Sequence, residues 1–194
     1  MKSVKIWVCA AAAALVVSGA FAQVSVSGVR FDESIDIKGA KTHLNGAGVR
    51  YKAIFKVYAA GLYLTRKAGT TEEVLAAPGA KRLSVTMLRD IDSSELGKLF
   101  SRGIEDNMDR AAFSKLIPGV IRMSQIFSDN KRLAAGETFS IDWIPGTGTV
   151  VMLRGVSQGE PFKEPEFYNA MLRIWLGSNP ADWKLKDALL GKPA

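Results

Sequence analysis

Arg50 is the residue whose surroundings point most clearly to binding chemistry. It follows the stretch Asn45-Gly46-Ala47-Gly48, where missing side chains let the backbone approach a neighbouring element or a ligand. A guanidinium presents a planar fork of donors that matches a carboxylate through two parallel hydrogen bonds. In an apolar cleft it keeps its proton and needs an anion, which either a ligand or an internal Asp or Glu can supply. The residue alone leaves both possibilities open, along with a position at the surface.

Other residue types give little support to catalysis or metal binding. His43 is the only histidine, so the sequence offers neither a histidine-based metal site nor a Ser–His–Asp triad. Ser93, Ser94 and Ser101 stand in no nucleophile context such as G-x-S-x-G. Acidic groups such as Asp92 and Glu95 are explained by the start of a helix and its solvated face. We therefore expect no metal and no cofactor.

Tyr58 is the second candidate, and it shares an apolar segment with Arg50. From Val49 the chain runs without glycine or proline to Gly61, and Val, Ile, Phe and Tyr dominate it. This composition predicts one long strand over residues 49–64 with at least one buried face. A phenol can donate to a carboxylate while its ring lines an apolar wall, although a core tyrosine is the alternative. Eight extended residues cover about 26 Å, so an unbroken strand would keep Arg50 and Tyr58 apart.

Further strands and helices surround this segment and together give the fold class. Asp92 suits the N-cap of a helix that carries one apolar stripe, formed by Leu96, Leu99, Phe100, Ile104 and Met108. Strands first and last with helices between predict an α+β domain, an antiparallel β-sheet with helices packed on one face. The other expected strands cover residues 24–29, 35–44 (a pair turning at Lys38-Gly39), 82–88, 138–144 and 149–153. The other expected helices cover residues 70–77, 111–127 (bent or interrupted at Pro118), 164–176 and 182–190.

The pattern L-x-G-A-G-x-R, followed by an aromatic strand that ends in Gly61-Leu62-Tyr63-Leu64, resembles the chalcone isomerase family. That family includes plant isomerases, plastid fatty-acid-binding proteins and bacterial proteins. The order of elements is similar over nearly the whole of residues 23–194, which we take as a single domain. The resemblance implies a chalcone isomerase-like open-faced β-sandwich.

The resemblance also implies roles for particular residues. Arg50 stands where the family places an arginine that faces the ligand pocket, and Tyr58 where fatty-acid-binding relatives use a tyrosine. Tyr168 stands where the plant enzymes have a pocket Thr or Ser, although an interfacial tyrosine on an amphipathic helix is the alternative. The tyrosine and asparagine positions of the isomerases fall on Leu96 and Gly103. A leucine cannot donate a hydrogen bond, so chalcone isomerase activity is not expected.

The first 22 residues have the layout of a secretory signal peptide. Lys2 and Lys5 precede an apolar run, and Ala20-Phe21-Ala22 is a small-x-small cleavage site before Gln23. Cleavage removes the only cysteine and leaves 172 residues, with no transmembrane segment expected among them. We therefore expect a periplasmic or secreted bacterial protein without disulfides or thiol chemistry.

The charge pattern argues against nucleic acid as a partner. The formal charge of +7 falls to +5 without Lys2 and Lys5, and the remaining cations are scattered among acidic residues. A mildly basic, solvated surface accounts for this pattern, because nucleic-acid binding needs a clustered basic stripe. The sequence does not identify protein partners.

Three hypotheses follow for the function. The preferred one is a non-catalytic protein that binds an apolar carboxylate such as a fatty acid, with Arg50 as the counter-charge and Leu96, Leu99 and Phe100 as the pocket wall. The second is an intramolecular lyase or isomerase for another substrate, with Arg50 stabilising an oxyanion. The third is an interaction protein whose pocket is filled by its own side chains.

Overall fold

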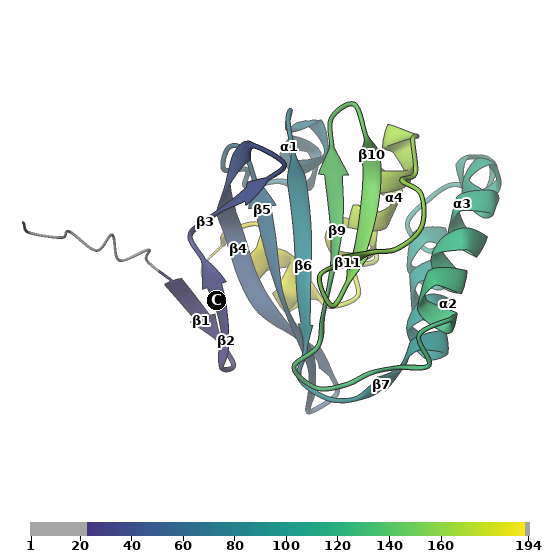
Figure 1. The fold of residues 1–194 in the computed structure, drawn as a ribbon. Helices are drawn as coiled ribbons and strands as arrows, with labels where there is room; N and C mark the ends of the chain where they lie inside the picture. Colours follow the sequence, from purple (N-terminus) through teal and green to yellow (C-terminus); the bar gives the residue numbers. More distant parts are fainter. Residues whose placement is uncertain (1–22, 193–194) are drawn as a thin grey trace, which may run out of the picture.

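A curled antiparallel sheet of seven strands forms the centre of the protein (Figure 1). The computed structural model describes residues 23–192, so the expected signal peptide lies outside the described residues and stays a prediction. The sheet has the order β11-β10-β9-β6-β5-β4-β3. Its strands are β3 (Ser34–Ile37), β4 (Ala40–Lys52), β5 (Phe55–Leu64), β6 (Lys81–Met87), β9 (Thr138–Ile144), β10 (Gly148–Leu153) and β11 (Val156–Ser157).

Helices cover one face of this sheet, which confirms the predicted α+β class. They are α1 (Thr71–Ala76), α2 (Ser93–Glu105), α3 (Arg110–Ser128), α4 (Pro165–Leu176) and α5 (Trp183–Leu189). Asp92 caps α2 as predicted, accepting hydrogen bonds from the backbone N–H groups of Ser94 and Glu95. Pro118 does not interrupt α3, which continues through it. Within residues 23–192 no helix is long and apolar enough to cross a membrane.

Two short pairings complete the fold. The strands β1 (Gln23–Val26) and β2 (Val29–Asp32) form a hairpin that packs on the opposite face of the sheet through Phe31, near Leu44 and Tyr63. The predicted single strand over residues 24–29 is therefore wrong, because the chain turns at Ser27-Gly28, where both residues adopt positive φ angles. The other pairing joins β7 (Ile91–Asp92) to β8 (Arg132–Leu133).

The predicted single strand over residues 49–64 is also wrong, and this error matters for function. The chain reverses at Ala53-Ile54 and makes β4 and β5 an antiparallel hairpin. Ala53 has a φ of 55°, a left-handed conformation that alanine rarely adopts. Because turns of this kind usually carry glycine, asparagine or aspartate, composition gave no sign of this one.

The glycines before Arg50 lie inside β4 and make room for α5. A Cβ atom on Gly46 would lie 1.9 Å from the carbonyl oxygen of Ala188, and one on Gly48 would lie 2.6 Å from the Cβ of Ala188. Only glycine therefore allows the last helix to lie directly on the strand. Buried Asn45 completes the junction, because its amide donates to the carbonyl oxygens of Ala68 and Leu189. The expected close approach is confirmed, although the segment is strand and not a free turn.

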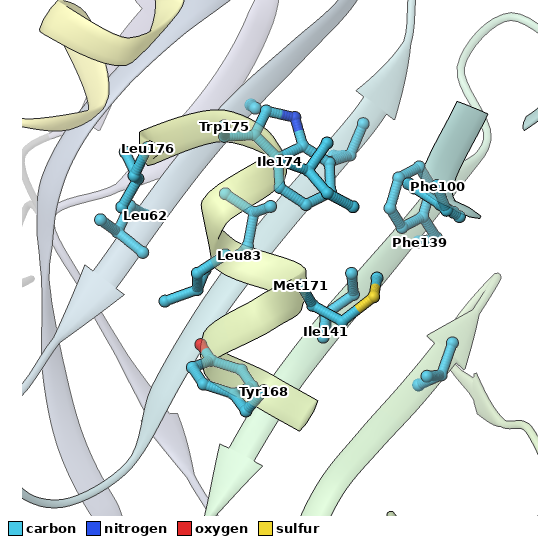
Figure 2. Close-up of a cluster of buried hydrophobic side chains, with 14 of the residues drawn as sticks. Leu62, Leu83, Phe100, Phe139, Ile141, Tyr168, Met171, Ile174, Trp175 and Leu176 are labelled. Carbon is cyan, nitrogen blue, oxygen red and sulfur yellow. The ribbon is translucent and has the colours of Figure 1, made fainter. Parts of the chain in front are cut away.

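The main core lies between the sheet and the helices. Figure 2 shows α4 lying across the sheet, with its buried side chains directed toward Leu62, Leu83 and Ile141. The side chain of Phe100 from α2 meets Phe139 of β9 edge to face, with the ring centroids 5.7 Å apart. Packing of this kind fixes α2 and α4 relative to β4 and β5.

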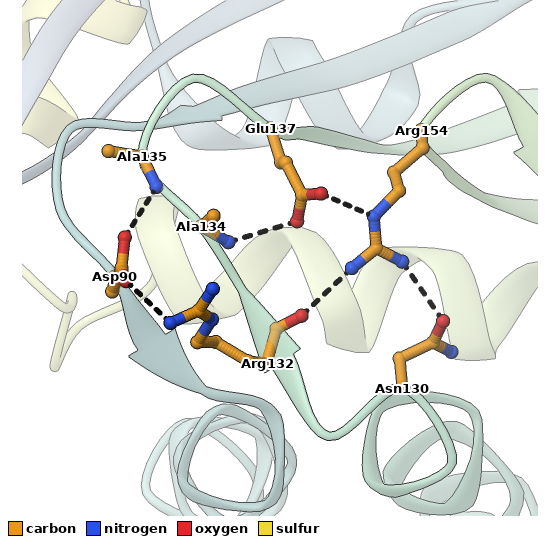
Figure 3. Close-up of polar contacts among 7 residues, drawn as sticks. All are labelled: Asp90, Asn130, Arg132, Ala134, Ala135, Glu137 and Arg154. Atoms are coloured by element: carbon orange, nitrogen blue, oxygen red, sulfur yellow. Dashed lines mark hydrogen bonds and ion pairs between the residues drawn. The ribbon is translucent and has the colours of Figure 1, made fainter.

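A polar network fixes the connection between α3 and β9 (Figure 3). The guanidinium of Arg154 donates to Glu137 at 2.7 Å, to Asn130 at 3.1 Å and to the carbonyl oxygen of Arg132 at 2.8 Å. Asp90 accepts from the backbone N–H of Ala135 at 2.9 Å and pairs with Arg132. This network ties the segment after β8 to the loop before α2. The helix α2 itself forms one wall of the site described next.

Candidate functional site

A cavity of about 170 Å³ lies between the β4–β5 hairpin, α2 and α4. Arg50 and Tyr58 contribute from the hairpin, and Ile174 and Trp175 contribute from α4. Leu96, Leu99, Phe100 and Gly103 line it from α2. The exposed residues Arg102, Asp106 and Asn179 line it at the solvent side, with Pro180 and Ala181 beside them.

The hairpin brings Arg50 and Tyr58 together. The two residues are cross-strand partners, and the guanidinium carbon of Arg50 lies 5.6 Å from the centre of the Tyr58 ring, within cation–π range. The separation of about 26 Å expected for an unbroken strand is therefore wrong. The turn at Ala53-Ile54 reverses the chain between the two residues.

Arg50 enters the cavity without an internal counter-ion. Its Nε is buried and has no hydrogen-bond partner among residues 23–192, and no Asp or Glu of that range lies within salt-bridge distance of its guanidinium. Asp182 is near enough to affect Tyr58 electrostatically. Its carboxylate instead accepts from the backbone N–H groups of Tyr51, Lys184 and Leu185. A buried, unpaired donor on a cationic group is costly unless another molecule accepts from it.

Tyr58 offers a second unused donor. Its hydroxyl oxygen accepts a hydrogen bond from Nε1 of Trp175 at 2.7 Å. An indole N–H can only donate, so the phenolic proton of Tyr58 remains free, and no acceptor for it lies within residues 23–192. Burial raises the pKa of Tyr58 to about 12, against the opposing effects of Arg50 and of the Trp175 hydrogen bond. The phenol therefore keeps its proton near neutral pH.

The α2 wall of the cavity is apolar. Leu96 and Phe100 are fully buried, and Leu99 is half-buried. Gly103 brings α2 close to α4, because a Cβ atom there would lie 3.0 Å from Cγ2 of Ile174. The predicted wall residues thus meet around the same cavity as Arg50, and so do the two positions that differ from the isomerase pattern.

A second cavity of about 190 Å³ adjoins the first, and Arg50 and Leu99 line both. Its other lining residues are mostly charged: Lys52, Arg89, Asp90, Asp92 and Glu95, with Val57 and Ile91. The apolar cavity and this polar one thus lie on either side of the Arg50 and Leu99 side chains.

Tyr168 does not reach these cavities. It lies seven residues before Trp175 on α4, about 10 Å away along the helix axis, and Figure 2 shows the two side chains toward opposite ends of the helix. Its ring packs 6.0 Å from that of Trp143. Its buried hydroxyl has no hydrogen-bond partner within residues 23–192, and burial raises its pKa well above the usual value. The structure therefore separates Tyr168 from Arg50 and Tyr58.

Trp175 is the site residue that sequence reasoning missed. It looked like one more apolar residue of the α4 stripe, because a buried tryptophan at helical spacing is usually a core residue. The available signal was its need for a hydrogen-bond acceptor, because an indole N–H rarely stays unpaired in a core.

Within residues 23–192 there is no group of His, Cys, Asp and Glu side chains that could hold a metal ion.

Comparison with known proteins supports the architecture. A family model described as chalcone isomerase-like matches residues 23–191. The crystal structure of a fatty-acid binding protein from Arabidopsis thaliana superposes with a TM-score of 0.71 at 17% sequence identity, covering 87% of this chain and 96% of that one. No curated protein sequence matches the chain. At this identity the structural likeness shows the fold alone.

Proposed function

Because the chain belongs to the chalcone isomerase-like family, we propose that it binds an apolar carboxylic acid in the cavity beneath Arg50. The observation that carries the proposal is the pair of unused donors, the buried Nε of Arg50 and the hydroxyl of Tyr58, beside one apolar cavity. The Arabidopsis protein of similar fold is a fatty-acid binding protein, and we extend that ligand class to this chain as part of the proposal.

The ligand's carboxylate satisfies both donors at once. Its oxygens accept from the guanidinium of Arg50 and from the phenol of Tyr58, and hydrogen bonds to charged groups are the stronger ones. Trp175 holds the Tyr58 hydroxyl in place through its own N–H. The apolar part of the ligand packs against Leu96 and Phe100, where burial of each methylene contributes about 0.8 kcal/mol.

The size of the cavity sets the class of acid. An engineered cavity of about 150 Å³ in another protein holds one benzene molecule, and the cavity here is about 170 Å³. It therefore suits one aromatic ring or a short alkyl chain behind the carboxylate. A long fatty acid needs either the solvent-side opening near Asn179 or displacement of Leu99 toward the second cavity.

The two other hypotheses have less support. An isomerase needs a general base, and a phenol whose pKa is about 12 is a weak proton acceptor near neutrality. Asp106 is the acidic side chain at the cavity, and it is solvent-exposed. An interaction protein with a filled pocket needs a collapsed core and an internal acid paired with Arg50, whereas the arginine lines an open cavity and pairs with no acid in residues 23–192.

Mass spectrometry of an organic extract tests the proposal. The protein is purified without denaturation from its producing cells, alongside the Arg50→Ala variant. We expect a stoichiometric apolar acid in the extract of the unchanged protein and its loss from the variant. A clean extract combined with no uptake of added acids would contradict the proposal. So would the same acid bound equally by both proteins.

A further inference from the structure

The turn of the β4–β5 hairpin exposes apolar side chains to solvent. Ile54 is 84% exposed, Phe55 is 58% exposed and Tyr51 is 41% exposed. Trp183, at the start of α5, is 60% exposed. It lies at the same end of the sheet, because its neighbour Asp182 accepts a hydrogen bond from the backbone N–H of Tyr51 at 2.8 Å. We call Tyr51, Ile54, Phe55 and Trp183 the tip surface.

Cations flank the tip surface. Residues 50–56 contain three cations and no acid. The guanidinium of Arg89 lies 5.6 Å from the centre of the Phe55 ring, and Nζ of Lys186 lies 5.0 Å from the centre of the Trp183 ring. Exposed Lys56 and Lys184 add to this charge.

The acidic groups beside the tip surface already have partners. Asp90 pairs with Arg132 at 3.1 Å, Asp92 caps α2, and Glu95 lies 3.7 Å from Nζ of Lys52. Asp182 caps α5. Capping leaves Asp92 and Asp182 charged, but the cations here outnumber these four acids, so the net charge around the exposed apolar side chains is positive. The cations are Arg50, Lys52, Lys56, Arg89, Lys184 and Lys186.

We propose that the tip surface docks the protein on the headgroup region of an anionic lipid bilayer. Exposed apolar patches rimmed by polar groups mark interaction sites. Tyrosine and tryptophan favour the membrane–water interface, and flanking lysines and arginines are attracted to anionic headgroups. A narrow convex turn with Ile54 at its end suits insertion between headgroups, whereas a protein interface usually needs a broader, complementary surface.

Docking through the tip surface would bring the Arg50 cavity close to the lipid surface. Arg50 lies near the turn of the same hairpin, three residues before Ala53. The ligand would then enter or leave close to the lipid surface. The docking inference stands on the exposed residues and their charges, and it does not depend on the ligand proposal.

Vesicle co-sedimentation tests the inference with the protein that begins at Gln23. Pure phosphatidylcholine vesicles are compared with vesicles that contain phosphatidylglycerol, at low and high salt. We expect binding to the anionic vesicles that weakens with salt. The double variant Ile54→Ser/Phe55→Ser should bind at least about tenfold more weakly, because its apolar insertion is lost. Lys52→Gln/Lys56→Gln should bind more weakly at low salt and show less salt dependence.

A matched control separates the tip surface from general hydrophobicity. Ile121 and Val156 are 64% and 63% exposed on other elements, so Ile121→Ser/Val156→Ser removes similar apolar surface and should leave vesicle binding unchanged. Trp183 gives a second readout, because its emission should shift to the blue with vesicles and the shift should vanish in Trp183→Phe. The inference is overturned if anionic vesicles do not bind the protein. It is also overturned if the tip and control variants bind vesicles alike. A dimer in sedimentation velocity that is lost in Ile54→Ser/Phe55→Ser would overturn it as well, because the tip surface would then be a protein interface.

Discussion

Arg50 and Tyr58 face each other across the β4–β5 hairpin, and Nε of the arginine and the hydroxyl of the tyrosine remain free to donate. Neither feature alone would indicate a ligand, because buried arginines usually pair with an acid and buried phenols usually find a backbone acceptor. Their combination beside one apolar cavity is what favours a carboxylate. The turn at Ala53-Ile54 produces this combination.

Removing the hydroxyl of Tyr58 should weaken both folding and ligand binding. Tyr58→Phe leaves the indole N–H of buried Trp175 without its acceptor, which should cost about 1–3 kcal/mol of unfolding free energy. Affinity for an apolar acid should fall severalfold as well. Urea unfolding and calorimetric titration measure the two effects.

Tyr63→Phe is the matched control, because Tyr63 lies on the opposite face of the sheet. A double-mutant cycle of Tyr58→Phe with Trp175→Phe should show coupling of about 1 kcal/mol. Additive effects would show that the hydrogen bond between the two side chains contributes nothing.

Substitution of Leu99 should change ligand size in both directions. Leu99→Trp adds volume at the wall between the two cavities, so it should exclude ring-sized acids while leaving Arg50 in place. Leu99→Ala should let longer chains bind, because it opens the first cavity toward the second. Titration with straight-chain acids of increasing length measures the preference. If both variants keep the preference of the unchanged protein, the ligand does not occupy this space.

The stability of the protein should rise with pH through the mildly alkaline range because of Lys81. Burial lowers the pKa of its amine from about 10.5 to about 8, and its Nζ donates to the carbonyl oxygen of Leu75. Between these two pH values the unfolded chain binds more protons than the folded protein, so raising the pH favours folding. Above about pH 10 the buried tyrosines oppose this trend, because the pKa values of Tyr58 and Tyr63 are raised to about 12.

Lys81→Met should remove this dependence. We expect it to raise the unfolding free energy at pH 7 by about 1–2 kcal/mol and to flatten the profile up to pH 9.5. Thermal unfolding across this range checks the prediction. Profiles that run parallel for the two proteins would show that Lys81 is not the group responsible.

The ion pair of Arg82 and Asp142 should stabilise the face of the sheet that lies away from the helices. The two residues are cross-strand partners in β6 and β9, and Nε of Arg82 donates to Asp142 at 2.7 Å. Asp142→Ala strands a largely buried guanidinium, which typically costs about 3–5 kcal/mol. A quarter of the Arg82 side chain is exposed, so we expect about 2–3 kcal/mol. The double variant Arg82→Met/Asp142→Leu should recover most of this loss in urea unfolding, and failure to recover would point to a cause other than the stranded charge.

Sequence reasoning succeeded where a residue type has a local mechanism. Asp92 caps its helix, Lys38-Gly39 turns between two strands, and the expected strands over residues 138–144 and 149–153 are present as β9 and β10. It failed at Ala53-Ile54, because nothing in the local chemistry favours a turn there and only the pairing of β4 with β5 imposes it. It also missed Trp175, whose role depends on an acceptor 117 residues away in the chain.

The candidate site residues could likewise be predicted where local spacing decides their position, and not where the position depends on the tertiary fold. The apolar spacing of Leu96, Leu99 and Phe100 was enough to place them on one wall. Tyr168 shares the apolar face of α4 with Trp175, yet two helical turns separate them. A periodic pattern identifies the buried face of a helix but not which end of that face lines a cavity.

Calorimetric titration with phenylacetate and phenylacetamide tests the central claim most directly. The two probes have the same ring and similar size, and they differ in the carboxylate that Arg50 and Tyr58 are proposed to bind. The account predicts that the acid binds at least about tenfold more tightly than the amide, and that Arg50→Ala abolishes this preference whereas Arg102→Ala at the cavity mouth preserves it. Equal binding of acid and amide, or a preference that survives in Arg50→Ala, would contradict it.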